Sequence, residues 1–208
     1  MQKEQVSFDL LEYHPLLIVL SGPSGVGKDA TLHALKKRDL PLHFVITATT
    51  REPREGEVYG VDYFFYTRDE FEELIAKNEL LEHALVYDDY KGIPKEQIRQ
   101  AMDSGLDVIL RVDVQGAATL RKLCPDAVLI FLLPSSVAEW HERLNNRQSE
   151  TAQSMKVRQE TVKRELDQLK IFDYMVTNKH NQLEDAVDTI VEIIHAEHHR
   201  TNPRKITL

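Results

Sequence analysis

The sequence predicts an α/β fold in which a parallel β-sheet is covered by helices on both faces. Two segments, Leu16–Leu20 and Ala127–Leu133, are short and fully apolar, which is typical of strands buried on both sides. The glycine-rich stretch 22–28 follows the first of them directly and precedes a helical pattern. Further strand and helix patterns alternate along the chain, and this alternation indicates a parallel sheet joined by helical crossovers.

The expected elements follow one another in a regular order. Apolar and β-branched runs predict strands at Leu16–Leu20, Phe44–Thr49, Tyr63–Tyr66, Val108–Val112, Ala127–Leu133 and Tyr174–Thr177. Helical patterns fall between or after them, at Asp29–Lys37, Asp69–Lys77, Pro94–Met102, 136–146, 155–170 and 181–199. Residues 50–62 are rich in Arg, Glu, Gly and Pro, which predicts a loop. We expect residues 1–14 to be a flexible leader and residues 200–208 to be frayed.

Composition narrows the class of protein. The chain has 208 residues, of which 42% are apolar and 29% charged, so one main domain with a sizeable core is expected. A formal charge of −8 argues against a general nucleic-acid binder, which needs a basic surface. Any anionic ligand must therefore be held by a local cluster of Arg and Lys. Cys124 is the only cysteine, so no intrachain disulfide can form, which fits a reducing compartment.

The sequence shows no targeting or membrane segment. Its first residues, MQKEQVSFDLLEY, are polar and acidic and have the layout of neither a signal peptide nor a transit peptide. The longest apolar runs are too short to span a bilayer. We expect a cytoplasmic protein without membrane contact, or one of an organelle stroma if a transit peptide was removed.

The glycine-rich stretch is a candidate phosphate-binding loop. Its residues match G-x-x-x-x-G-K between a strand and a helix, the context that this motif requires. Glycines let backbone N–H groups point inward, the helix N-terminus adds partial positive charge, and Lys28 can reach the β- and γ-phosphates of ATP. The alternative is a simple glycine-rich turn. The residues are Gly22, Pro23, Ser24, Gly25, Val26, Gly27 and Lys28.

The residue after the lysine departs from the motif. Ser or Thr normally stands there and ligates Mg²⁺ through its hydroxyl, but this chain has Asp29. A carboxylate is also a hard oxygen ligand, so Asp29 is the candidate Mg²⁺ ligand, although it adds negative charge beside a polyphosphate. Thr31 is too far along the helix to replace it.

A second phosphate site is predicted in residues 49–63. Arg51 and Arg54, three positions apart in a loop, can together bind a phosphate, and the Tyr63 phenol can donate to the same group. Glu82 follows in ELLEHA. The alternative is a charged loop in solvent.

The motifs, in this order and spacing, resemble the guanylate kinase family over roughly residues 15–195. They are GPSGVGK at 22–28, TTREPREGEVYGVDYFF at 49–65, VDVQGA at 112–117 and ERLNNR at 142–147. Three further segments resemble the chloroplast and cyanobacterial branch of that family: GKDA at 27–30, YKGIPKEQI at 90–98 and LRVDVQGAATLR at 110–121.

The resemblance implies an architecture and a reaction. The fold is that of a P-loop NTPase, a three-layer sandwich whose core comprises residues 15–46, 106–139 and 161–199 of a domain spanning 15–199. A GMP-binding lobe is inserted at 47–105 and a short helical lid at 140–160. The reaction transfers the γ-phosphoryl group of ATP to GMP, and to dGMP, in purine nucleotide metabolism with Mg²⁺, in a monomer or homodimer.

The resemblance also implies roles for single residues. On the ATP side are the loop residues 22–28 with Asp29 and Ala30, and Asn178, which seats the adenine. Arg51, Arg54 and Tyr63 hold the GMP phosphate, Glu82 accepts from guanine N1–H and the 2-amino group, Thr47 supports the base, and Lys91 and Asp113 lie beside the GMP. The implied catalytic cations are Lys28, Arg51, Arg143, Arg147 and Arg158.

Further positions differ from the commoner pattern of that family. Lys91 replaces a tyrosine near the acceptor phosphate, and Ile93 replaces a hydroxyl residue that binds guanine O6. Arg111 replaces an acid two residues before Asp113. We expect the exchanges at Asp29 and Arg111 to compensate each other, with Arg111 near enough to pair with Asp29 or a phosphate.

Two alternative functions remain at this stage. One is a small-molecule kinase on the same scaffold with a sugar-phosphate acceptor. The presence of four residues argues instead for a nucleotide acceptor: Arg51, Arg54, Tyr63 and Glu82. The other is a non-catalytic binding module, which the intact Lys28 and lid arginines disfavour.

We expect structural roles for four further residues. His195, His198 and His199 share a helix face, but with no acid partner evident a solvated helix end is preferred to a metal site. We expect Trp140 to serve in packing.

Overall fold

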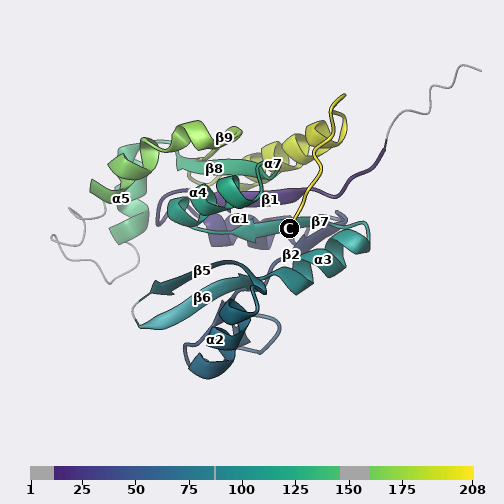
Figure 1. The fold of residues 1–208 in the computed structure, drawn as a ribbon. Helices are drawn as coiled ribbons and strands as arrows, with labels where there is room; N and C mark the ends of the chain where they lie inside the picture. The colour runs from purple at the N-terminus through teal and green to yellow at the C-terminus, as the bar shows by residue number, and fades with distance from the viewer. Residues whose placement is uncertain (1–11, 87, 146–159) are drawn as a thin grey trace, which may run out of the picture.

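The computed structural model describes residues 12–86, 88–145 and 160–208, which form two sheets with helices around them (Figure 1). The larger sheet has five strands in the order β2-β7-β1-β8-β9, and every neighbouring pair is parallel. The parallel α/β core predicted from the sequence is therefore confirmed. The strands are β1 (Leu17–Ser21), β2 (Leu42–Phe44), β7 (Asp107–Arg111), β8 (Val128–Pro134) and β9 (Tyr174–Asn178).

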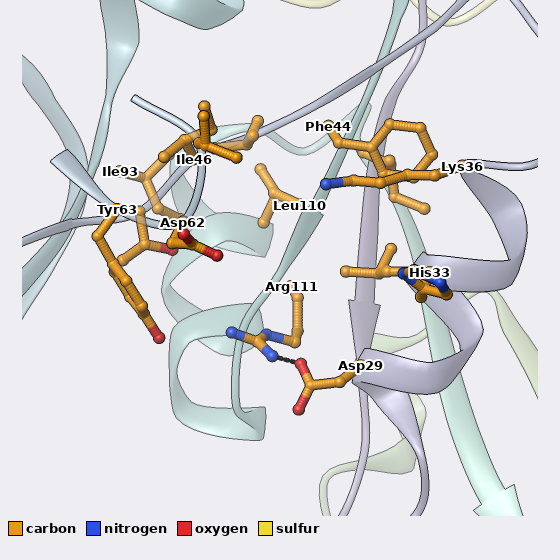
Figure 2. A pocket seen from close by; sticks show the side chains of 15 residues that line it. Asp29, His33, Lys36, Phe44, Ile46, Asp62, Tyr63, Ile93, Leu110 and Arg111 are labelled. Atoms are coloured by element: carbon orange, nitrogen blue, oxygen red, sulfur yellow. Dashed lines mark ion pairs between the residues drawn. The ribbon is translucent and has the colours of Figure 1, made fainter. Parts of the chain in front are cut away.

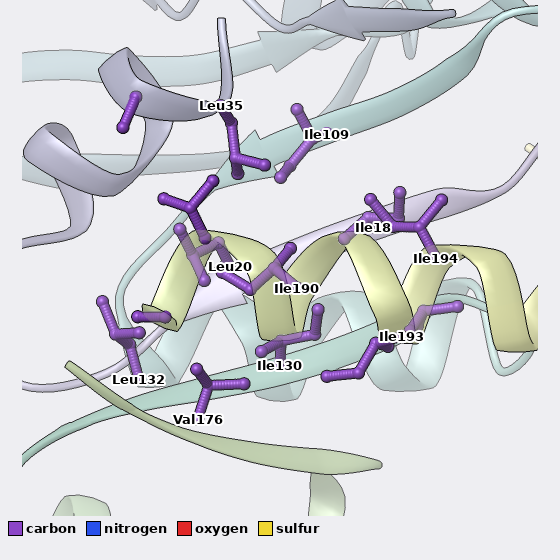
Figure 3. Packing of buried hydrophobic residues seen from close by; sticks show 14 of the residues in the cluster. Ile18, Leu20, Leu35, Ile109, Ile130, Leu132, Val176, Ile190, Ile193 and Ile194 are labelled. Atoms are coloured by element: carbon purple, nitrogen blue, oxygen red, sulfur yellow. The ribbon is translucent and has the colours of Figure 1, made fainter. Parts of the chain in front are cut away.

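Helices bury both faces of this sheet because successive strand residues point to opposite sides. Ile18 and Leu20 of β1 belong to a cluster that includes Leu35 of α1 (Lys28–Leu35) and Ile190 of α7 (Leu183–His198), as Figure 3 shows. Leu17 and Val19 point to the other face of the sheet. They belong to a second cluster, to which α3 (Lys95–Asp103) and α4 (Val114–Leu123) also contribute residues. Burial on both sides explains why β1 and β8 read as continuous apolar runs.

The smaller sheet hangs below the core in Figure 1, and its strand order is β4-β3-β6-β5. It lies within residues 47–105, where the resemblance implies the GMP-binding lobe. Helix α2 (Arg68–Ala76) packs the fully buried Phe71 against it, and Thr67 and Glu70 form a capping box at the start of that helix. The strands are β3 (Ala48–Thr49), β4 (Phe64–Phe65), β5 (Leu80–Val86) and β6 (Asp89–Pro94).

The single strand predicted at Phe44–Thr49 is wrong. Strand β2 ends at Phe44 in the large sheet, and β3 begins at Ala48 in the small one, so the apolar run crosses between two sheets. The side chain of Gln97 on α3 fixes the crossing. Its amide nitrogen donates to Ile46 O at 2.7 Å, and its amide oxygen accepts from Ile46 N at 2.8 Å.

The prediction of a frayed C-terminus is also wrong. Residues 200–208 have no regular structure, but Ile206 and Leu208 pack on the core cluster that contains Leu17. Arg204 donates to the buried Glu197 through Nε at 2.7 Å and Nη2 at 3.0 Å. The thiol of Cys124, which is 2% exposed, donates to Thr207 O at 3.0 Å. The tail is therefore part of the folded core.

The end of helix α7 only partly matches its prediction. His195 and His199 are exposed, but His198 Nε2 donates to Asp107 Oδ2 at 2.8 Å, and its ring stacks on Tyr13 with ring centroids 4.6 Å apart. The acid partner was not evident from the sequence because Asp107 lies 91 positions away. In the described part of the chain, no group of three or more His, Cys, Asp or Glu is arranged to hold a metal ion.

The described residues also contain α5 (Val137–Asn145), a helical stretch at 160–166 and a short 3₁₀ helix, η1 (Leu169–Ile171). Trp140 on α5 is 4% exposed, which confirms that it packs in the interior. Among residues 12–86, 88–145 and 160–208, no helix has the length and apolar character needed to cross a membrane.

Candidate active site

The glycine-rich loop joins the end of β1 to the start of α1, as its motif predicts. Gly22, Gly25 and Gly27 have φ angles of 139°, 86° and 100°, which side-chain-bearing residues rarely adopt. Space is limiting as well: a Cβ on Gly22 would overlap the Leu132 carbonyl oxygen, and one on Gly27 would overlap the Asn178 amide. The backbone at these positions therefore requires glycine.

Donors around the loop bind its carbonyl groups. Trp140 Nε1 donates to Ser24 O, and Asn178 Nδ2 donates to Val26 O, both at 2.9 Å. The Lys28 ammonium donates to Gly22 O at 2.5 Å and to Pro23 O at 3.0 Å. Each carbonyl held in this way fixes the orientation of its peptide group, and so of the N–H on the other side. The contacts hold the loop in one shape before a ligand arrives.

Two residues predicted to act on ATP contact this loop from neighbouring elements. Asn178, 4% exposed, ends β9 and bonds Val26 O. Arg143 on α5 donates to Val26 O at 2.9 Å and to Asn178 O at 2.8 Å, and also pairs with Glu139. Its role toward phosphate stays a prediction, because its recorded contacts are to protein atoms. Arg147 and Arg158 lie outside the described residues.

The predicted acceptor arginines lie in an ordered loop before β4. Arg51 Nη2 binds both oxygens of the Glu57 carboxylate, at 2.8 and 2.9 Å, and Glu57 also accepts from Arg54 N at 2.7 Å. The Arg51 guanidinium lies 5.4 Å from the centroid of the Tyr63 ring. The backbone bond from Arg54, together with Arg51, holds the pKa of Glu57 below its usual range despite a smaller effect of burial. The side chain of Arg54 is exposed.

A cavity of about 240 Å³ opens between the two sheets. Strand pairing places Glu82 of β5 directly opposite the buried Ile93 of β6, and Ala84 opposite Lys91. Burial, and to a lesser degree the charge of Asp113, raise the pKa of the Glu82 carboxyl. The cavity brings together most of the predicted acceptor residues with the loop lysine. Its polar lining residues are Lys28, Thr47, Tyr63, Glu82, Lys91, Arg111 and Asp113.

Asp113 also shapes the local backbone. It is the N-cap of α4, and its Oδ1 accepts from Gly116 N at 2.8 Å. The cap fixes the point at which the chain leaves β7 and turns into the helix. The carboxylate remains exposed at the carboxyl end of the parallel sheet, where ligands of such folds bind.

A second cavity, of about 230 Å³, adjoins the first between α1, β7 and the loop before β4 (Figure 2). Thr47, Tyr63, Ile93 and Arg111 line both cavities. At its edge Arg111 pairs with Asp29, which confirms the predicted proximity of these two residues. Ala30 follows Asp29 in the first turn of α1, where it is exposed.

The comparisons with known proteins agree with one another. The family model described as guanylate kinase matches residues 14–197. Guanylate kinase 2, chloroplastic/mitochondrial, of Oryza sativa subsp. japonica is 47% identical over 195 residues, covering 93% of this chain and 68% of the relative. The guanylate kinase of Bacillus subtilis is 45% identical and covers 88% of this chain and 89% of the relative.

The chain belongs to the guanylate kinase family. Among solved structures, the guanylate kinase from Anaplasma phagocytophilum superposes with a TM-score of 0.72 at 29% identity, covering 92% of this chain and 90% of the other. The family resemblance inferred from the motifs is thus confirmed, as are the P-loop α/β fold and the classification as an enzyme. The binding-module and sugar-phosphate alternatives receive no support from these matches.

Two residues with a clear role in the site were not predicted. Glu57 holds Arg51 and the backbone of Arg54, and Gln97 holds the segment that enters the small sheet. The spacing of an acid three and six positions after two arginines was a signal for the first. No local signal existed for the second, because its partner Ile46 lies 51 positions away.

Proposed function

We propose that this member of the guanylate kinase family transfers the γ-phosphoryl group of ATP to a phosphate oxygen of GMP, and of dGMP, giving ADP and GDP or dGDP. One observation carries the proposal. The cavity lined by Lys28 of the phosphate loop is also lined by Glu82 of the small sheet, so a phosphate-binding and a base-binding group face the same space.

The reaction requires alignment more than covalent participation of the protein. An oxygen of the GMP phosphate attacks the γ-phosphorus, and the bond from that phosphorus to the β,γ-bridging oxygen breaks. The bonding electrons leave with ADP, and the summed charge of ATP⁴⁻ and GMP²⁻ equals that of ADP³⁻ and GDP³⁻. Catalysis of such a transfer depends on holding the groups in line and on cations that stabilise the shared oxygens.

The ATP phosphates would lie in the loop 22–28. Its fixed peptide groups and the N-terminus of α1 provide positive potential, and Lys28 would release its carbonyl partners to bind the β- and γ-phosphates. Asn178 would orient the adenine side through its contact with Val26. Arg143, with Arg147 and Arg158, would supply further positive charge.

The acceptor would lie in the cavity between the sheets. Arg51, Arg54 and Tyr63 would bind the GMP phosphate, with Lys91 adding charge. The ionised Glu82 carboxylate would accept from guanine N1–H and the 2-amino group, and Thr47 and Asp113 would border the nucleotide. Ile93 offers no donor to guanine O6, which leaves Glu82 as the main reader of the base.

The residues present fit a magnesium ion. Mg²⁺ in nucleotide sites is held mainly by substrate phosphates and water, with only one or two protein oxygens. Asp29 follows Lys28 directly, and its side chain is 71% exposed, so a carboxylate oxygen is available there. The bound ion would neutralise charge on the β- and γ-phosphates.

A coupled assay of ATP with a panel of acceptors tests the proposal. We expect turnover of GMP and dGMP, with discrimination against AMP and UMP of about 10⁴-fold in kcat/KM, because a buried acceptor left unpaired rejects the wrong base. Glu82→Gln should reduce kcat/KM for GMP and leave the KM for ATP unchanged. Turnover of a ribose phosphate with none of GMP would overturn the proposal.

The proposal also includes a compartment, an oligomeric state and binding partners. The chain acts in the cytoplasm of a cell or the stroma of an organelle, as a monomer or homodimer, with ATP and GMP as its partners. The name of the rice relative, chloroplastic/mitochondrial, supports the organelle option.

A further inference from the structure

Arg111 lies where the two cavities adjoin. It is the last residue of β7, which pairs with β1 on one side and β2 on the other, so its side chain leaves the carboxyl edge near the middle of the core sheet. It lines both the cavity that contains Lys28 and Glu82 and the adjoining cavity beside α1. Figure 2 shows its guanidinium between Tyr63 and Asp29.

Asp29 holds the arginine from one side. The ion pair joins Arg111 Nη1 to Asp29 Oδ1, and Asp29 is the one partner of this guanidinium among the described residues. A guanidinium has five N–H donors in a planar fork, so a single carboxylate leaves donors for another anion. Asp29 comes directly after Lys28, so the pair ties Arg111 to the turn that binds the ATP phosphates.

The ion pair between Arg111 and Asp29 contributes little to the stability of the fold. The side chains of Arg111 and Asp29 are 34% and 71% exposed, and pairs this accessible contribute about 0–1 kcal/mol. Burial lowers the pKa of Arg111, but arginine stays protonated in proteins. The cavity wall therefore carries a permanent cation, beside the acids Glu82 and Asp113.

We propose that Arg111 is a further catalytic residue, which contacts the phosphoryl group as it passes from ATP to GMP, and that Asp29 is its positioning residue. This inference rests on the proposed function. The transferred group must cross from the phosphate loop at Lys28 to the acceptor cavity. Arg111 lines this cavity together with Lys28 and Lys91, and its pair with Asp29 holds it beside the loop. Bidentate donors there stabilise the equatorial oxygens most when charge spreads over them in the transition state.

The test compares four single variants and one double variant, by kinetics and by binding. Arg111→Met removes the charge and keeps the length, Arg111→Lys keeps the charge without the fork, and Asp29→Asn removes the positioning carboxylate. Arg38→Met is the matched control, because Arg38 has a similar exposure of 37% but pairs with Glu184 and Asp188 on the surface. Binding is measured for GMP alone, ADP alone and a bisubstrate in which guanosine and adenosine are joined by five phosphates.

We expect the loss of the Arg111 guanidinium to weaken phosphoryl transfer and bisubstrate binding, but not the binding of either nucleotide alone. Arg111→Met should lower kcat by about 10²–10³-fold, the usual effect of removing one preorganised donor. It should weaken bisubstrate binding at least about tenfold while GMP and ADP bind within about twofold of the parent chain. Arg111→Lys should recover part of kcat. At saturating Mg²⁺, which compensates for a weakened metal contact at Asp29, Asp29→Asn should lower kcat about tenfold and add nothing to Arg111→Met in the double variant, because both changes then remove the same ion pair.

Two results would overturn this inference, and a third would overturn the proposed function instead. Unchanged kcat and unchanged bisubstrate affinity in Arg111→Met would show a surface ion pair only and overturn the inference. A parallel loss of GMP binding, ADP binding and melting temperature would show a structural role and also overturn it. A parent chain that phosphorylates no guanine nucleotide overturns the proposed function instead, and the assay of the unmodified chain decides that first.

Discussion

Glu57 illustrates how a single carboxylate can prepare a site for a phosphate. It holds Arg51 through both oxygens and accepts from the backbone of Arg54, so the arginine loop is ordered without a ligand. A guanidinium already fixed in place loses less freedom when it binds a phosphate. Glu57 binds Nη2 of the guanidinium, and Nη1 donates to the Glu52 carbonyl oxygen at 2.6 Å, so the fork is held through both of its terminal nitrogens.

Loss of this contact should weaken GMP binding selectively. We expect Glu57→Gln to raise the KM for GMP roughly tenfold, because a misplaced cation aligns the acceptor poorly, and to leave the KM for ATP within about twofold. Initial-rate kinetics at fixed ATP measure it, with the exposed neighbour change Glu55→Gln as the control. A lower KM for GMP would show instead that Glu57 competes with the phosphate.

The raised pKa of Glu82 predicts a pH dependence of GMP binding. Only the ionised carboxylate accepts from both guanine donors, so affinity is complete above the pKa and falls as the pH drops through it. Because burial and Asp113 raise this pKa, the loss should begin at a higher pH than for an ordinary glutamate, whose pKa is about 4.3. KM for GMP measured between about pH 5 and 7 should rise on acidification and be flat in Glu82→Gln. An equal slope in both would assign the titration to another group.

Single residues could be predicted where one role dictates the residue type. Gly22, Gly27 and Lys28 were predicted because their backbone angles and charge leave few alternatives. Glu57, Gln97 and His198 could not be, because each acts through a partner that only the fold brings near. The Arg111–Asp29 pair was predicted from two departures that balance in charge.

At the scale of elements, the C-terminal tail is attached by a buried charge network. Glu197 on α7 is 0% exposed at its side chain and binds Arg204, which also lies 3.4 Å from Asp173. Tyr174 of β9 donates to the same carboxylate at 2.6 Å. Burial alone would raise the pKa of Glu197, but the bonds from Arg204 and Tyr174 outweigh it and lower the pKa.

Removing one partner should show how much this network contributes to the free energy of unfolding. We expect Arg204→Ala to lower the free energy of unfolding by about 3 kcal/mol, because it leaves a buried carboxylate without its main cation. Urea unfolding followed by circular dichroism measures it. Arg200→Ala is the control, since its guanidinium is 45% exposed and 3.6 Å from Glu197, and should cost less than about 1 kcal/mol. Equal small losses would mean that the tail contributes little to stability.

Elements buried on both faces were the easiest to predict, and those of the small sheet the hardest. Strands β1, β7, β8 and β9 read as apolar runs, but the hairpin β5–β6 contains Glu82, His83, Lys91 and Gly92 and was missed. One of its faces lines the cavity between the two sheets, and the polar residues on that face interrupt the apolar alternation typical of a strand. Helix α4 was missed as well, because its Gly116 and Ala117 lie buried without a strong apolar stripe.

At the scale of the molecule, the two sheets form two bodies joined at a few points. The chain enters the small sheet through Val45–Thr47, held at Ile46 by Gln97, and returns through α3. Both cavities open between these bodies, so a transfer that excludes water requires the bodies to approach each other.

Closure should be measurable in solution. GMP and a non-hydrolysable ATP analogue together should reduce the radius of gyration in small-angle X-ray scattering, and either nucleotide alone should reduce it less. Domain closure around paired substrates is a common device of kinases, and it prevents hydrolysis of ATP. An unchanged radius with both ligands bound would count against closure, provided that binding is verified by calorimetry.

The burial of the single thiol has a practical consequence for observing that motion. Cys124 is enclosed beneath the C-terminal tail, and burial raises the pKa of its thiol further from neutrality. Maleimide dyes react with exposed thiolates, so the native cysteine should remain unlabelled in the folded chain. A pair of cysteines introduced at exposed positions, one on each sheet's body, can therefore carry donor and acceptor fluorophores without any change to the native sequence elsewhere. The opening and closing of single molecules then becomes a distance that can be followed in time.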